Sequence, residues 1–167
     1  PEWNDPVTPD TLPLLRLCYV RLGFLASGYV NQIGVPPTNR LPASLARPLC
    51  RVCELLGRPP MLSYDGYALY NWYRIDPHGP IALGNIDTLQ NFVSLYDEHW
   101  FILVHIEIEA LAAQSLAAIL ALEGSGWTDR VCVNNAIRSI TRNIRAMTAV
   151  LRRIPERMSP DLYFKAF

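Results

Sequence analysis

The stretch FILVHIEIEALAAQSLAAILAL at residues 101–122 decides the fold, because its apolar side chains recur at helical spacing without a break. The stretch is long enough to span a membrane, but it carries four polar side chains that are costly to place in hydrocarbon: His105, Glu107, Glu109 and Gln114. We therefore interpret it as the buried part of a helix in a soluble protein. The helix is expected over about residues 97–123, before the break Gly124-Ser125-Gly126.

Composition indicates one globular domain. Of the 167 residues, 50% are hydrophobic, and 15 Lys and Arg balance 15 Asp and Glu. Zero net charge gives no long-range attraction to nucleic acid or to an anionic membrane, so neither is expected as a partner. Four cysteines are too few for a disulfide scaffold, and no secretory leader precedes them. We therefore expect a cytoplasmic protein.

The rest of the chain also reads as helical, which predicts an all-α fold. Caps and breaks place helices over residues 8–33, 43–56, 62–73, 97–123 and 128–154. Residues 76–96 read as a long irregular connection, and no alternating stretch is long enough to predict a strand. The last long helix has an apolar stripe and an arginine face, which we interpret as solvated: Val133, Ile137, Ile140, Ile144, Met147, Leu151 and Ile154 against Arg138, Arg142, Arg145 and Arg152.

Three groups of side chains suggest chemistry, and each also has a purely structural interpretation. Tyr64 and Tyr67 lie one helical turn apart, where they form either one wall of a pocket or part of a packed aromatic cluster. His105 has mostly apolar neighbours, and Glu109 follows it at i+4 on the same helix face. The two side chains could bind a metal together or form a buried pair. Cys50 and Cys53 lack a second ligand pair and are interpreted as core cysteines. We therefore assign no metal ligand.

Five stretches together resemble one family, the haem-containing indoleamine 2,3-dioxygenases. They follow one another in the family's order and spacing over about residues 10–167: LPASLARP at 41–48, LGRPPMLSYDGYALYNW at 56–72, DPHGPIALGNIDTL at 76–89, WFILVHIEIEALAAQS at 100–115 and MSPDLYFKAF at 158–167. The resemblance lies in this collinearity and not in any single motif.

The resemblance implies a fold and a reaction. Residues 1–167 would form a helical bundle that corresponds to the first part of the large haem-binding domain, without the small N-terminal domain and the C-terminal proximal half. With haem b and O2, such enzymes open the indole ring of L-tryptophan or a related indoleamine to give N-formylkynurenine, which starts the kynurenine pathway. The remainder of the parent polypeptide would be needed, so residues 1–167 alone are expected to be inactive.

The resemblance also assigns roles to individual residues. Tyr64, Tyr67 and Ala68 would line the distal pocket around the indole. Phe101 and His105 would follow from the next helix, with His105 as the catalytic residue. Mammalian members have serine at the His105 position, whereas the related tryptophan 2,3-dioxygenases have a distal histidine that can bind the indole N–H. Tyr163 and Phe164 would match an aromatic pair that contacts substrate, and the proximal haem ligand is expected downstream of Phe167.

Two alternatives remain open at this stage. A related haem oxygenase could act on another indole or aromatic metabolite, because Tyr67 and His105 make the pocket different. The chain could also be a non-catalytic helical interaction module, in which the arginine face serves a partner.

Overall fold

The computed structural model describes residues 7–125 and 127–162. The chain divides into two compact units: unit 1 is Pro1–Trp72 with Leu89–Ser94, and unit 2 is Tyr73–Thr88 with Leu95–Phe167. The interpretation of residues 1–167 as part of one large haem domain stays a prediction.

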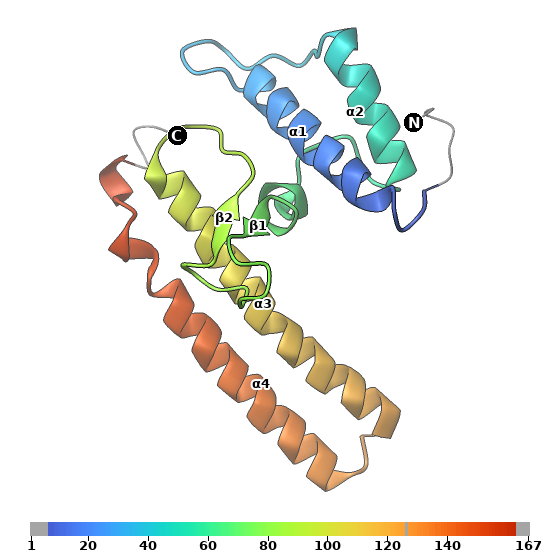
Figure 1. The fold of residues 1–167 in the computed structure, drawn as a ribbon, viewed down its shortest axis with the longest axis vertical. Coiled ribbons are helices and arrows are strands. Elements are labelled where there is room, and N and C mark those ends of the chain that lie inside the picture. The colour runs from blue at the N-terminus through green and yellow to red at the C-terminus, as the bar shows by residue number, and fades with distance from the viewer. Residues whose placement is uncertain (1–6, 126, 163–167) are drawn as a thin grey trace. The chain divides into compact units, whose positions relative to one another are not determined.

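Unit 1 is built on two helices that lie side by side, α1 (Leu12–Val30) and α2 (Ala43–Leu55) (Figure 1). Helix α1 begins later than the predicted Thr8 cap. Thr8 and Thr11 instead form a turn in which each backbone N–H donates to the other's hydroxyl, at 2.9 and 3.2 Å, and Thr11 is the N-cap. The core of the unit consists mainly of these buried residues: Tyr19, Val20, Phe24, Leu49, Val52 and Cys53.

A short π-helix, η1 (Asp65–Leu69), replaces most of the third predicted helix. The two strands that follow, β1 (Trp72–Arg74) and β2 (Ile86–Thr88), pair in a small sheet that the sequence did not predict. Strands of three residues are too short to show an alternating pattern. With this addition, the structure confirms the all-α expectation.

Unit 2 is dominated by a helical hairpin of α3 (Tyr96–Ser125) and α4 (Arg130–Leu151), which run antiparallel, followed by a 3-10 turn, η2 (Ile154–Glu156) (Figure 1). The Asp129 carboxylate caps α4 by accepting the backbone N–H groups of Val131 and Cys132 at 2.8 and 3.3 Å. This pairing satisfies two N–H groups that have no partner within the helix.

The predicted stripe of α4 is only partly buried. Ile137, Ile144 and Leu151 of the stripe are exposed on the described chain, and its other members are half-buried. The buried residues of α4 are Ala136, Asn143 and Val150, which lie beside the predicted stripe. Both sets repeat every seven residues, so spacing alone did not distinguish them. Small and polar side chains face α3 instead, and the Asn143 amide donates to Ser115 Oγ at 3.2 Å.

Helix α3 is buried near its start and exposed toward its end. Trp100 and Val104 pack with Val150 of α4, while Leu116 and Leu120 are exposed. By length and composition alone, Tyr96–Gly124 would suffice to cross a membrane, and 22% of its apolar window is buried. A single such helix is weak evidence, because core helices of globular proteins meet the same criterion.

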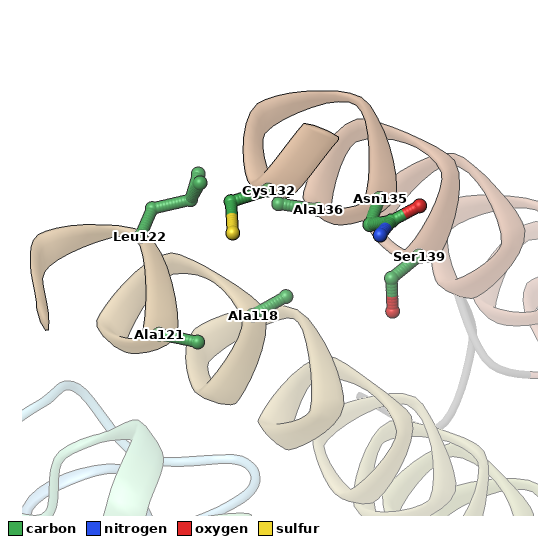
Figure 2. A pocket seen from close by; sticks show the side chains of 7 residues that line it. All are labelled: Ala118, Ala121, Leu122, Cys132, Asn135, Ala136 and Ser139. Carbon is green, nitrogen blue, oxygen red and sulfur yellow. The ribbon is translucent and has the colours of Figure 1, made fainter. Parts of the chain in front are cut away.

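At the closed end of the hairpin, small side chains from both helices leave a hollow of about 290 Å³ (Figure 2). Ala118, Ala121 and Leu122 line it from α3, and Cys132, Asn135, Ala136 and Ser139 line it from α4. None of the candidate site residues lines this hollow.

Candidate functional site

The first group of candidate residues lies on and beside η1 in unit 1. The Tyr70 N–H donates to the carbonyl oxygen of Asp65 at 2.8 Å, which closes a wide turn of five residues. Such π turns are rare and are found frequently at functional sites. The turn sets the directions of Tyr64, Tyr67 and Ala68.

These three side chains have different environments. Ala68 is buried, and Tyr67 is half-buried with its ring stacked 5.8 Å from Phe24 and 6.1 Å from Phe92. Tyr64 is 46% exposed. The Tyr67 ring therefore packs with other aromatic rings of unit 1, and Tyr64 is the more accessible phenol.

A buried network around Tyr19 of α1 holds the segment that leads into η1. The Tyr19 hydroxyl donates to the carbonyl oxygen of Met61 at 3.0 Å, accepts the Ser63 N–H at 3.0 Å and lies 2.8 Å from Ser63 Oγ. Arg58 Nη2 donates to Asp65 Oδ1 and to Ser63 Oγ, both at 2.6 Å, and Ser63 Oγ also donates to Asp65. The Arg58 guanidinium lies 3.7 Å from the centre of the Tyr19 ring.

The Arg58–Asp65 pair shifts the pKa of both groups toward their charged forms. The hydrogen bond from Arg58 lowers the pKa of the Asp65 carboxyl, with a smaller contribution from Ser63, and the bond to Asp65 raises the pKa of Arg58. Both side chains are mostly shielded from water, at 17% and 29% exposure. The pair therefore stays ionised at neutral pH.

Gly66 is required by the close approach of η1 to Tyr19. A Cβ atom built on Gly66 would lie 2.6 Å from Cε1 of the Tyr19 ring and 2.8 Å from its hydroxyl oxygen. The ring is fully buried and held by its hydrogen bonds, so it has no room to move aside. Gly28 in α1 has nothing within 4 Å of the equivalent position.

Gly66→Ala is expected to destabilise the protein by about 1–3 kcal/mol, because overpacking displaces either the ring or the π turn. Chemical denaturation measures the change. Gly28→Ala is the matched control and should be neutral or stabilising by up to about 1 kcal/mol, since alanine favours a helix. Equal stability of the two variants would contradict the close approach.

Asp65→Asn is expected to lower the free energy of unfolding at neutral pH by about 1–3 kcal/mol, because Arg58 loses its charged partner. A lowered carboxyl pKa adds stability above its unfolded value of about 4, and that stability is lost as the pH falls through the folded value. The difference between wild type and variant should therefore shrink below about pH 4.

The exposed ion pair of Arg51 and Glu54 in the same unit supplies the control for this experiment. Glu54→Gln should change stability by no more than about 0.5 kcal/mol at any pH. A difference between wild type and Asp65→Asn that stays constant down to pH 2 would contradict the assigned pKa shift.

The second group of candidate residues lies on α3 in unit 2. Phe101 and His105 are one turn apart and half-buried, and their ring centres are 4.2 Å apart. The neighbouring face of α3, with Trp100 and Val104, is buried within unit 2. Phe101 and His105 therefore lie on a helix that packs within unit 2 through a different face, the one with Trp100 and Val104.

The hydrogen bond of His105 determines where its proton lies. Nδ1 is 2.7 Å from the carbonyl oxygen of Phe101, and a carbonyl oxygen only accepts, so Nδ1 carries the hydrogen. In the neutral ring, Nε2 then has the lone pair and acts as an acceptor. The backbone bond also fixes the orientation of the ring.

The other candidate clusters do not assemble a metal site. No group of three or more His, Cys, Asp or Glu side chains that could hold a metal is found within residues 7–125 and 127–162. Cys53 is buried as interpreted, and burial raises the pKa of its thiol, whereas Cys50 is exposed.

The structure places the predicted site residues in two separate groups. Tyr64, Tyr67 and Ala68 belong to unit 1, and Phe101 and His105 belong to unit 2. Tyr163 and Phe164 lie outside the described residues. The convergence of all these side chains on one substrate stays a prediction.

The sequence did not predict the groups that hold η1 in place: Tyr19, Arg58, Ser63 and Asp65. A faint signal was present, because an arginine and an aspartate flank a turn-rich stretch that starts with Pro59-Pro60. The sequence also did not predict a hollow in unit 2, which is lined by His99, Arg153 and Arg157 among others.

Comparison with known proteins decides the family. The sequence model of indoleamine 2,3-dioxygenase matches residues 8–167, which is nearly the whole chain. The chain belongs to the indoleamine 2,3-dioxygenase family. The α3 segment with Phe101 and His105 lies inside the matched region, as does η1.

Curated relatives come from animals and fungi. The chain is 31% identical over 153 residues to indoleamine 2,3-dioxygenase 1 of Rattus norvegicus, covering 90% of this chain and 38% of the relative. It is 29% identical over 158 residues to indoleamine 2,3-dioxygenase of Saccharomyces cerevisiae, covering 90% of this chain and 35% of that relative. It is 28% identical over 151 residues to 6-hydroxytryptophan 2,3-dioxygenase of Fusarium equiseti, covering 87% of this chain and 36% of that relative. The chain thus spans less than half the length of these relatives.

Proposed function

We propose that the protein containing this chain is a haem-dependent dioxygenase that opens the indole ring of L-tryptophan, or of a related indoleamine, to give N-formylkynurenine or its analogue. Membership of the family supports the reaction class. The observation that carries the proposal is the pairing of Phe101 and His105 on α3, where a flat ring adjoins an imidazole of fixed orientation. This chain then supplies the distal wall of the haem pocket.

The residues of α3 fit the distal side of a haem. A distal wall needs a flat apolar surface and few polar groups, and this face of α3 offers the Phe101 ring and one imidazole whose Nδ1 is already used by the backbone. Haem b, when bound, supplies the binding and activation of O2. Phe101 and His105 would face it, while the proximal ligand is proposed to come from the remainder of the parent polypeptide.

The chain's own residues would bind and orient the indole. Since Nδ1 of His105 carries the hydrogen, Nε2 accepts the indole N–H and fixes the position of the ring. Phe101 provides a flat surface for stacking, and exclusion of water protects the reacting atoms. Tyr64, Tyr67 and Ala68 would complete the wall. Orientation of the substrate is therefore the main catalytic contribution proposed for these side chains.

The partners follow from this reaction. We propose O2, L-tryptophan or a related indole, and the remainder of the parent polypeptide, with no role for nucleic acid or a membrane. We also propose a cytoplasmic location, which agrees with the four cysteines being unpaired in the described chain.

A second candidate substrate is supported by one relative. The Fusarium equiseti protein, which is 28% identical to this chain, is named for 6-hydroxytryptophan, a ring-substituted indole.

The mass of the product separates a dioxygenase from a related monooxygenase. Gain of two oxygen atoms supports ring opening by a dioxygenase, and gain of one supports a monooxygenase. A stable complex with another protein in the absence of any haem spectrum would favour a non-catalytic interaction module.

His105→Ala in the full-length protein is expected to lower kcat/KM for tryptophan by about tenfold to a hundredfold, because a hydrogen bond to the indole N–H is lost. Haem content should stay near normal. With 1-methyltryptophan, which has no indole N–H, the same substitution should have little effect. Steady-state kinetics and the haem absorbance measure these outcomes.

His78→Ala is the control, because His78 is exposed in a turn of unit 2. It should leave turnover and haem content unchanged. Loss of haem from His105→Ala would identify His105 as an axial ligand and contradict its distal role. An equal loss of turnover for tryptophan and 1-methyltryptophan would contradict the hydrogen bond to the indole.

A further inference from the structure

A second hollow lies within unit 2, where the start of α3 meets the chain after α4 and the loop before β2. Its volume is about 380 Å³. Leu83, Ile86 and Leu103 give it an apolar wall, and His99, Arg153 and Arg157 are among its polar lining residues. The hollow does not include Phe101 or His105, so it is separate from the distal wall proposed above.

The one carboxylate in the lining, Asp87, already has three partners. Its Oδ1 accepts the Thr88 N–H at 2.7 Å and lies 2.6 Å from Nε2 of His99, and its Oδ2 accepts the Tyr73 hydroxyl at 3.2 Å. The charge of Asp87 also raises the pKa of Tyr73, which keeps that hydroxyl a donor. The Asp87 carboxylate is therefore already engaged by neighbouring groups of unit 2.

The two arginines of the hollow differ in their partners. Arg153 Nε lies 3.1 Å from a carboxylate oxygen of Glu156, so its charge is paired. Arg157 donates to the Tyr96 hydroxyl at 3.2 Å and lies 5.6 and 5.3 Å from the ring centres of Tyr96 and Trp100. Among the described residues, no carboxylate forms an ion pair with Arg157. Arg157 is therefore a cation without a carboxylate partner among the described residues, and it borders a hollow that has an apolar wall on one side.

We propose that this hollow is a binding site for a small aromatic carboxylic acid. The carboxylate pairs with Arg157, which presents several N–H donors in one plane. The flat body of the ligand lies against the apolar wall and the neighbouring His99 ring, which is 5.1 Å from the ring of Tyr96. An apolar wall beside the Arg157 guanidinium favours an organic acid over inorganic phosphate, which has no apolar surface to bury.

The test is titration calorimetry on the full-length protein with 2-naphthoate, in low salt so that the ion pair is not screened. The uncharged 2-naphthamide should bind at least about tenfold more weakly than the acid, because it lacks the charge that pairs with Arg157. Calorimetry reports this binding whether or not the protein turns over an indole, so the result is independent of the proposed dioxygenase activity.

Variants assign the binding to this hollow. Arg157→Gln is expected to weaken 2-naphthoate binding at least about tenfold. Arg157→Lys, which keeps the charge but loses the planar set of donors, should bind 2-naphthoate more tightly than Arg157→Gln and more weakly than the wild type. Arg152→Gln is the matched control, because Arg152 is an exposed neighbouring arginine that does not line the hollow. Thermal melting of each variant verifies that it is folded.

Four outcomes would overturn the proposal: no binding of 2-naphthoate to the folded wild type, equal binding of acid and amide, unchanged affinity in Arg157→Gln, or binding to Arg157→Lys that is no tighter than binding to Arg157→Gln. Displacement of 2-naphthoate by millimolar inorganic phosphate would overturn the assignment to aromatic acids and identify a general anion site.

Discussion

The hydroxyl group of the fully buried Tyr19 ring binds both Met61 and Ser63, and the order of unit 1 around η1 depends on this contact. The stretch it holds follows two prolines and has no regular secondary structure until the π turn begins. Leu62, between the two hydrogen-bonded residues, also packs against the core of unit 1. The Arg58–Asp65 pair adds a second attachment on the same side, and Gly66 permits the close approach. The directions of Tyr64 and Tyr67 follow from this anchoring.

The other half of the candidate site is positioned in a different way. On α3, regular helix geometry alone sets Phe101 one turn from His105, and a separate face of the helix packs against α4 through Val104 and Val150. The hydrogen bond from His105 to the carbonyl oxygen of Phe101 then fixes the imidazole. A side chain that is held by its own helix keeps its orientation while substrate enters and leaves. This arrangement suits a group whose proposed role is to orient an indole.

Much of the fold was predictable from the sequence, because caps, breaks and apolar spacing are local signals. Helices were expected over 43–56, 97–123 and 128–154, and the structure has them at Ala43–Leu55, Tyr96–Ser125 and Arg130–Leu151. The buried face of α4 was harder to predict, because Ile137 and its buried neighbour Ala136 belong to two adjacent stripes of the same period. The contacts of Tyr19 with Met61 and Ser63 join residues more than forty positions apart, and no periodic pattern reports such contacts. The hydrogen bond from Arg157 to Tyr96 also joins distant positions, and no periodic pattern predicts it.

On the proposed function, this chain forms the distal wall of a haem site. Reconstituting the full-length protein with hemin, reducing it and recording the absorption spectrum before and after adding carbon monoxide tests this proposal. We expect a Soret band that shifts when carbon monoxide binds to the ferrous haem. A folded protein that shows no such shift would rule out the proposed haem site.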